Sequence, residues 1–303
     1  MEQPELEIVV VSHGASVLLR NCLSSLREHP ASVPSRVTVV DSGSPDETPD
    51  MVAAEFPEVR LIRLGNVGFS AANNEVLREA LTGPGEEGST TPRLYLLLNP
   101  DTEVRVGTLD AAVARLESDE SIGMVGVRLT TPDGRFDHAS KRAFPTPLSA
   151  LAHFSGIGRL PSAPGRLSQY RATWLDETQP GPVDAVNGAF MLVRREALSK
   201  VGLLDEGYWL YMEDLDWCRR FGQAGWTVFY EPAGEAIHVK GGSSPDRRRL
   251  RQEVAFHRGM GRFYRRFDAP GNPGVLNLLV YLGIAAKLAS SLLISWCRSS
   301  CRP

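Results

Sequence analysis

The 303-residue sequence is poor in cysteine, with only four, and these form neither a CxxC pair nor a zinc-binding spacing. This argues against a disulfide framework and favours a reduced, cytosolic environment. The chain also lacks an excess of one charge, because 33 Lys and Arg face 36 Asp and Glu, and this balance argues against a general nucleic-acid binder. The first residues show no basic segment followed by an apolar run, so we expect no signal peptide.

Several common catalytic motifs are absent. There is no GxxxxGK[ST] phosphate loop and no GxGxxG after the first apolar run, which excludes the usual ATPase and dinucleotide-binding interpretations. Neither a GxSxG elbow nor an HExxH helix is present. The six histidines are scattered along the chain. Any chemistry must therefore depend on carboxylates, with the help of at most one histidine.

Short apolar runs alternate with helical periodicity over the first 130 residues. Four of these runs are predicted to be strands, at residues 8–11, 37–40, 59–64 and 94–98. Between the last two, Ser70 is expected to cap a helix that ends near residue 81. The βαβαβ order predicts a doubly wound α/β fold, with a mainly parallel sheet and helices on both faces. Ligands bind beyond the carboxyl ends of such strands, and Asp41 and Asp101 lie at these ends.

The pattern changes in the second half of the chain. Residues 132–182 are rich in Pro, Gly and Ser and lack periodicity, which predicts irregular structure such as a lid or an acceptor-side insertion. Regular structure is expected again as strand, helix, helix and strand, in the segments 183–193, 195–201, 213–225 and 227–230.

Two aspartates follow predicted strands. Asp41 stands in the string Val-Val-Asp-Ser-Gly-Ser, where a carboxylate can accept the N3–H of uracil or thymine; an Asx-turn that ends the strand is the alternative. Asp101 in Asn-Pro-Asp can hold Mg²⁺ or Mn²⁺ against a diphosphate, or it can be part of a structural turn. His238, expected just past a strand and its turn, can supply a second ligand through an imidazole nitrogen, although a lone histidine is more often structural.

Three carboxylates lie within four residues in the string Tyr-Met-Glu-Asp-Leu-Asp at 211–216. They can simply complement a helix N-terminus. Aromatic residues crowd the entry to this helix, however, and aromatic faces beside acids suit a polyhydroxyl ligand. Glu213 and Asp214 project about 100° apart on a helix. One can therefore position an acceptor while the other removes its proton.

Taken in this order, the motifs resemble those of the family 2 inverting glycosyltransferases. The resemblance covers about residues 8–242 and implies a GT-A fold, a nucleotide-diphospho-sugar transferase architecture with a Rossmann-like mixed sheet. It implies a catalytic domain at 1–242 and a C-terminal helical extension at 243–303. Within the family, Leu-Asn-Pro-Asp together with Tyr-Met-Glu-Asp-Leu-Asp is most similar to bacterial rhamnosyltransferases that act on polyprenyl diphosphate-linked sugars.

The resemblance implies a role for each matching residue. The expected donor-nucleotide contacts are Ser12, Asp41, Ser42, Ser44, Asn66, Gly68, Asn73 and Asn99. A divalent cation, Mg²⁺ or Mn²⁺, is expected on Asp101 and His238, with Asn99 replacing the first aspartate of the usual DxD. Asp214 is the expected base, next to Glu213. The expected acceptor contacts are Asn187, Gly188, Trp209, Tyr211 and Asp216.

The implied reaction is the transfer of a sugar, favoured to be L-rhamnose from dTDP-rhamnose, to a hydroxyl of a glycan or lipid-linked sugar in cell-envelope polysaccharide synthesis. A UDP-hexose-dependent enzyme with a soluble acceptor is the runner-up. A non-catalytic nucleotide-binding module is disfavoured because Asp101, Asp214 and His238 are all present. A nucleotidyltransferase would need a basic loop after the first strand, and residues 12–16 contain no Lys or Arg.

The apolar segment at 275–297 is long enough to span a bilayer, but it contains Lys287 and several serines. An arginine-dense stretch at 247–266 precedes it. This arrangement favours attachment in the plane of an anionic leaflet, at the cytoplasmic face of the cell membrane. The alternative is a helix that packs on the catalytic domain or on a partner in a homodimer.

Overall fold

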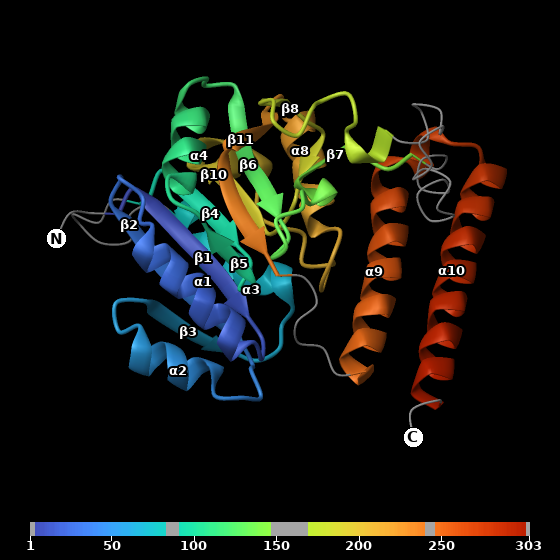
Figure 1. The fold of residues 1–303 in the computed structure, drawn as a ribbon. Coiled ribbons are helices and arrows are strands. Elements are labelled where there is room, and N and C mark those ends of the chain that lie inside the picture. The colour runs from blue at the N-terminus through green and yellow to red at the C-terminus, as the bar shows by residue number, and fades with distance from the viewer. Residues whose placement is uncertain (1–3, 83–90, 147–168, 240–245, 301–303) are drawn as a thin grey trace.

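The computed structural model describes residues 4–82, 91–146, 169–239 and 246–300. An α/β domain is flanked on one side by two long helices (Figure 1). The strands of its main sheet are β1 (Leu6–Ser12), β2 (Ser35–Ser42), β3 (Arg60–Leu64), β4 (Leu94–Leu98), β5 (Thr102–Val104), β6 (Ile122–Thr130), β8 (Gly181–Pro182), β10 (Phe190–Arg194) and β11 (Thr227–His238). A second, two-stranded sheet pairs β7 (Lys141–Arg142) with β9 (Ala185–Val186).

The strand order of the main sheet is β3-β2-β1-β4-β10-β6-β11-β5, with β8 paired to β11. Strands β1 to β4 are parallel, as expected, whereas β10 runs antiparallel between β4 and β6. The sheet is therefore mixed, as the family resemblance implied. Strand β11 extends eight residues beyond the predicted 227–230, because it resumes pairing with β6 after a register shift between Glu231 and Glu235.

Helices cover both faces of the main sheet. They are α1 (Ser16–Glu28), α2 (Thr48–Glu55), α3 (Phe69–Thr82), α4 (Thr108–Glu117), α7 (Arg195–Val201), α8 (Glu213–Gln223), α9 (Asp246–Phe267) and α10 (Gly274–Ser300). All seven residues of β1 are buried, and they alternate between two apolar clusters: Ile8 joins the side covered by α1, α2 and α4, and Val9 the side covered by α3, α7 and α8. This alternation follows from the two-residue period of a strand.

One predicted helix start is corrected. Helix α3 begins at Phe69, so Ser70 lies inside its first turn, where it is fully buried, and is not the N-cap. The region 132–182 is less irregular than expected where it is described, since it contains β7, β8 and the 3-10 turns η1 (His138–Ser140) and η3 (Gln169–Arg171). Residues 147–168 lie outside the described part of the chain.

The C-terminal helices differ in how they meet the domain. Helix α9 packs against it, and Phe263 is part of the α3–α7–α8 cluster. Helix α10 packs along α9, with the Tyr264 and Tyr281 rings edge to face at 5.6 Å; the turn η4 (Ala269–Gly271) connects the helices. Residues Gly274–Leu293 are long and apolar enough to cross a membrane by length and composition. The predicted boundary at 242/243 lies in a segment outside the described residues.

Candidate active site

A cleft of about 890 Å³ opens where β1, β2, β4 and β11 end. Most of the residues selected from the sequence line it: Ser12, Ser42, Asn66, Gly68, Asn99, Asp101, Asn187, Gly188, Trp209, Tyr211, Glu213, Asp214 and His238. They come from the last residues of β1, β2 and β11, from loops, and from the start of α8. The parallel direction of the strands brings them together, since their carboxyl ends meet at one edge of the sheet.

Two residues expected on the donor side lie just behind this surface. Asp41 Oδ2 accepts the Ser44 backbone N–H at 3.2 Å, and Ser44 Oγ accepts the Gly14 backbone N–H at 2.8 Å. Asp41 Oδ1 is buried and has no hydrogen-bond partner among the described residues. These contacts hold the loop after β2 against the loop after β1 and leave one buried carboxylate oxygen of Asp41 without a hydrogen-bond partner among the described residues.

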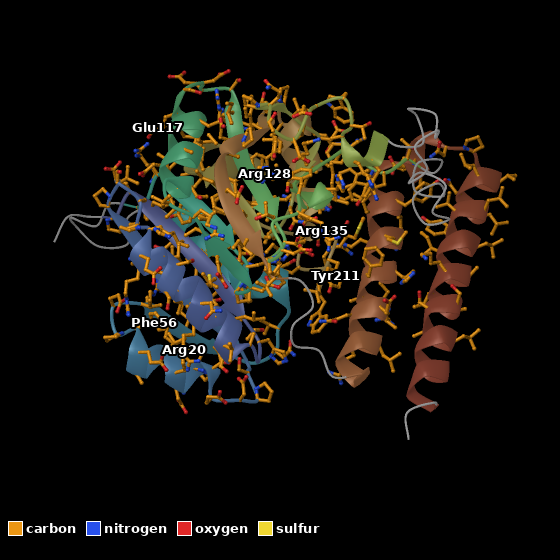
Figure 2. The ribbon with its side chains drawn as sticks, viewed as in Figure 1. Arg20, Phe56, Glu117, Arg128, Arg135 and Tyr211 are labelled. Atoms are coloured by element: carbon orange, nitrogen blue, oxygen red, sulfur yellow. The ribbon has the colours of Figure 1, made fainter. Side chains whose placement is uncertain are left out.

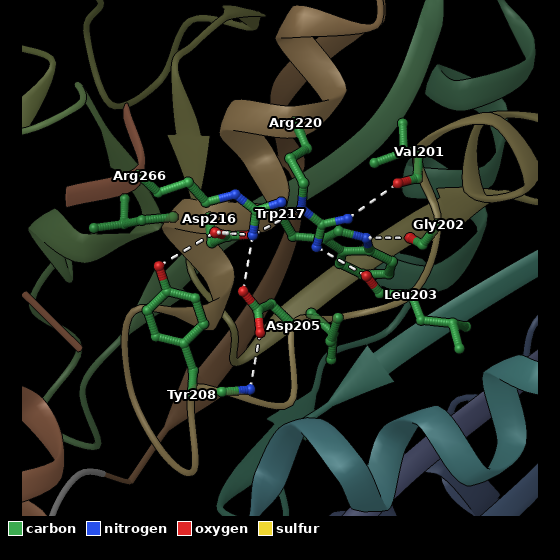
Figure 3. A network of polar contacts seen from close by, with 12 residues as sticks. Val201, Gly202, Leu203, Asp205, Tyr208, Asp216, Trp217, Arg220 and Arg266 are labelled. Carbon is green, nitrogen blue, oxygen red and sulfur yellow. Dashed lines mark hydrogen bonds and ion pairs between the residues drawn. The ribbon is translucent and has the colours of Figure 1, made fainter. Parts of the chain in front are cut away.

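Asn73 and Asp216, which were also expected to contact a substrate, lie away from the cleft. Asn73 is buried in α3, where its amide donates to the Phe69 carbonyl at 2.9 Å and stabilises the first turn. Asp216 is fully buried on the face of α8 away from the cleft, and it is paired with Arg220 at 2.7 Å and Arg266 at 3.0 Å (Figure 3). Neither side chain lines the cleft, so the acceptor contact expected for Asp216 does not fit its position.

Asp101 and His238 lie next to each other. His238 is the last residue of β11, not past it as expected, and its register partner on β5 is Thr102. His238 Nε2 therefore lies 3.3 Å from Asp101 Oδ1, a buried oxygen that accepts no hydrogen bond from the described residues. On the other side of the ring, Nδ1 lies 3.6 Å from Oδ2 of Asp137, which the sequence analysis missed because nothing in its local pattern marks it.

Asp101 and His238 can supply part of a binding site for a divalent cation. A carboxylate oxygen and an imidazole nitrogen facing the cleft are suitable ligands, and a carboxylate behind a ligating histidine orients the ring. Within the described ranges, no group of three or more His, Cys, Asp and Glu side chains forms a metal site by itself. The remaining ligands would have to come from a substrate such as a diphosphate.

The acidic pair at the start of α8 is held by a residue that the sequence analysis missed. Arg142, on β7, donates from Nη2 to Asp214 Oδ2 and to the Val186 carbonyl, both at 2.5 Å. The Gly188 backbone N–H also points at Asp214 Oδ2, at 3.3 Å. Nothing in the string Ser-Lys-Arg-Ala-Phe marks Arg142, because its partner lies on another element.

Glu213 and Asp214 have different environments. Burial, and then the neighbouring Asp214 carboxylate, raise the pKa of Glu213 to about 8. Glu213 is therefore protonated at neutral pH. The Asp214 side chain is 13% exposed, lines the cleft and is paired with Arg142. Of the two acids, Asp214 is thus the one that is accessible from the cleft.

The turn before the acidic pair has an unusual backbone. Tyr211 and Met212 both have positive φ angles, +69° and +73°, which non-glycine residues rarely adopt. The turn contacts the loop after β3, where the Phe69 backbone N–H donates to the Trp209 carbonyl at 2.8 Å. Gly68 has φ +88°, and a Cβ there would lie 2.4 Å from Trp209 Cδ1, so this close approach requires glycine.

Comparison with known proteins gives consistent matches. The model of the family "Glycosyl transferase family 2" matches residues 7–202. The chain is 31% identical to an N-acetylglucosaminyl-diphospho-decaprenol L-rhamnosyltransferase of Mycobacterium tuberculosis over 79% of this chain and 77% of that protein. It is 24% identical to the low-salt glycan biosynthesis hexosyltransferase Agl10 of Haloferax volcanii, over 77% of this chain and 67% of that one.

Among solved structures, a mannosyltransferase from Pyrobaculum calidifontis, in complex with GDP-Man and Mn²⁺, superposes with a TM-score of 0.56 at 18% identity, covering 96% of this chain and 76% of that one. The mixed sheet and the cleft at its strand ends define a glycosyltransferase with the GT-A fold. The chain belongs to glycosyl transferase family 2, which confirms the resemblance in the sequence motifs.

Proposed function

We propose that this glycosyltransferase transfers a sugar, with inversion, from a nucleoside diphosphate to a hydroxyl of a lipid-linked sugar, and that Asp214 is the base. One observation carries the proposal: the accessible carboxylate of Asp214 shares a cleft with the Asp101–His238 pair. A base and a diphosphate-binding end in one cleft are what direct displacement at an anomeric carbon requires.

In the proposed reaction, Asp214 accepts the proton of the acceptor hydroxyl as that oxygen attacks the anomeric carbon. The bond from this carbon to the diphosphate breaks, and the electron pair leaves with the diphosphate. Arg142 and the Gly188 N–H orient the Asp214 carboxylate through Oδ2. A divalent cation on Asp101 and His238 would supply positive charge that stabilises the departing diphosphate. Protonated Glu213 adds no second negative charge beside Asp214.

The proposed donor is dTDP-rhamnose. The unsatisfied Asp41 Oδ1 supports a base that offers an N3–H, which thymine and uracil have and cytosine lacks. The adjacent Ser42 lines the cleft, as do four further proposed nucleotide contacts, Ser12, Asn66, Gly68 and Asn99. The name of the mycobacterial relative, an L-rhamnosyltransferase, supports rhamnose as the sugar. A UDP-hexose is the second candidate, because uracil offers the same N3–H.

The proposed acceptor is a polyprenyl diphosphate-linked sugar, a class supported by the name of the mycobacterial relative. Trp209 and Tyr211 are partly exposed in the cleft, where aromatic faces can stack on sugar rings, beside Asn187 and Gly188. Helix α9 closes this side with Arg251, Gln252 and Phe256, and Arg251 offers a positive charge to an anionic diphosphate.

We also propose peripheral contact with the cytoplasmic face of the membrane through residues 243–303. Several large apolar side chains of α10 are exposed: Val275, Leu278, Leu279, Tyr281, Leu282 and Leu293. A patch of this kind needs a covering partner, and a lipid-linked acceptor would itself lie at the membrane. A homodimer through the same helix is the alternative.

The decisive experiment measures nucleotide binding and turnover of Asp214→Asn. We expect the variant to bind dTDP normally and to lose turnover with dTDP-rhamnose and a lipid-linked acceptor. Asp50→Asn is the control, since Asp50 is a highly exposed acid on α2 outside the cleft. Near-normal turnover of Asp214→Asn would exclude Asp214 as the base.

A further inference from the structure

The segment from Asp205 to Met212 leads directly into the Glu213–Asp214 pair, and α9 lies against it. Figure 2 shows Tyr211 between the α/β domain and α9. The ring of Phe256 on α9 meets the ring of Tyr211 edge to face, with centroids 6.0 Å apart. Helix α9 lies outside the part of the chain that matches the family model, residues 7–202.

The backbone of α9 comes close to this segment at Gly259. A Cβ at this position would lie 3.0 Å from Met212 Cγ and 3.1 Å from the Tyr211 carbonyl oxygen, which is tighter than ordinary van der Waals contact. Because Gly259 has no side chain, the backbone of α9 can pack directly against Tyr211 and Met212, the two residues with positive φ. Left-handed backbone at non-glycine residues persists only where the surroundings hold it in place.

Two arginines of α9 fix the helix in this position. Arg262 donates from Nη2 to Asp205 Oδ1 at 2.8 Å, and Arg266 donates from Nη1 to Asp205 Oδ2 at 2.8 Å. Arg266 Nη1 also reaches Asp216 Oδ2, at 3.0 Å. Figure 3 shows Arg266 bridging the two aspartates, while the Tyr208 hydroxyl donates to Asp216 at 3.2 Å. Helix α9 is thus bonded both to the start of the segment and to α8, which follows it.

We propose that α9 positions the base: Gly259, Arg262 and Arg266 hold the Tyr211–Met212 turn so that the first residues of α8 present Asp214 to the acceptor hydroxyl. These are positioning residues, because they act through the turn and do not line the cleft. The proposal rests on the proposed role of Asp214. It gives the C-terminal region a function in catalysis that is separate from any membrane contact.

The test compares Gly259→Ala with Gly261→Ala. A Cβ at Gly261, two residues along the same helix, meets nothing within 4 Å, so this variant is a matched control. We expect Gly259→Ala to lower kcat about tenfold or more, because small displacements of a reacting group are costly. The KM of Gly259→Ala for the donor and its melting temperature should stay near those of Gly261→Ala. The kcat of Gly261→Ala should equal that of the unchanged enzyme. Arg266→Gln should also lower kcat, with partial recovery in Arg266→Lys.

A double-mutant cycle separates positioning from a general structural effect. If Gly259→Ala acts through Asp214, it should lower the residual turnover of Asp214→Asn little further. Equal kcat in Gly259→Ala and Gly261→Ala would overturn the positioning proposal alone, provided that Asp214→Asn has lost all but a small residual turnover. A fall in kcat that follows the loss of folded protein would overturn it too. Normal turnover of Asp214→Asn would instead reject the proposed base, and the positioning proposal with it.

Discussion

Nη2 of Arg142 lies 2.5 Å from Oδ2 of Asp214, although 72 residues separate the two in the chain. Both side chains are mostly buried, at 11% and 13% exposure. The pair joins the small β7–β9 sheet to the N-terminus of α8, and it brings a positive charge next to two adjacent acids. The orientation of the proposed base therefore depends on a residue from the least regular part of the sequence.

Replacing this arginine should impair both stability and turnover. Arg142→Met leaves the mostly buried Asp214 carboxylate without its cation, which we expect to cost about 3–5 kcal/mol of unfolding free energy. Turnover should fall by about 100-fold as the carboxylate moves. The stability and turnover of Arg142→Lys should lie between those of Arg142→Met and the unchanged enzyme. The lysine keeps the positive charge but loses the second contact, to the Val186 carbonyl. Denaturant unfolding and steady-state kinetics measure these effects. Arg135→Met, whose ion pair with Asp133 is highly exposed, should change neither.

The raised pKa of Glu213 predicts a pH dependence of stability. Its pKa is 4.5 in a model peptide and about 8 in the folded chain. Between these values the native state holds a proton that the unfolded state has lost, so this group stabilises the fold fully below about pH 4.5 and progressively less up to about pH 8. Glu213→Gln should remove this component. The unfolding free energy, measured from pH 5 to pH 9, should therefore decrease less steeply with pH in Glu213→Gln than in the unchanged protein. Identical slopes would contradict the raised pKa of Glu213.

The proposed cation site predicts a linked loss of metal and nucleotide binding. We expect a chelator to abolish turnover and added Mn²⁺ or Mg²⁺ to restore it. Asp101→Asn should weaken Mn²⁺-dependent binding of dTDP in calorimetry. Asp137→Asn should weaken it by about 10–100-fold, because Asp137 acts through the His238 ring. Metal-independent turnover in the unchanged enzyme would exclude the site.

Asp41 should set the preference for the base. A charged acceptor opposite the N3–H contributes about 1.5–3 kcal/mol, so dTDP and UDP should bind at least about tenfold more tightly than CDP. In Asp41→Asn the amide can also donate to cytosine, and the preference over CDP should shrink. Thermal-shift titrations with dTDP, UDP, CDP and GDP measure this preference for the base. Preferential stabilisation of the unchanged enzyme by GDP would contradict the assignment.

The apolar face of α10 should govern membrane binding. Replacing Leu278, Leu279 and Leu282 by Gln removes side chains that would each contribute about 1.5–3 kcal/mol when buried in lipid. We expect co-sedimentation with anionic liposomes to be lost, while turnover on a short-chain, water-soluble acceptor is kept. If the triple variant instead changes a dimer into a monomer and binds liposomes as before, α10 is a protein interface.

The sequence alone determined the first four strands and the order of the motifs. The apolar runs from β1 to β4, and the turn residues after Asp41 and Asp101, are local signals that a chain carries in its own periodicity. They were sufficient to predict the α/β layers and to place Asp41 and Asp101 at one edge of the sheet, whereas most of the other cleft residues were selected through the family resemblance. The mixed character of the sheet followed only from the family resemblance, because strand direction depends on connections that no short pattern records.

The tertiary structure decided which side of each element faces the cleft. Asp214 and Asp216 are two residues apart on α8, so their side chains project about 200° apart, and only the packing of the helix shows that one is accessible and the other buried against Arg266. Arg142, Asp137 and Gly259 act on residues far away in the chain, and the partner of each is set by the fold. Such contacts leave no mark in the surrounding sequence, because a side chain's neighbours in space are chosen by packing between elements and not by the residues beside it.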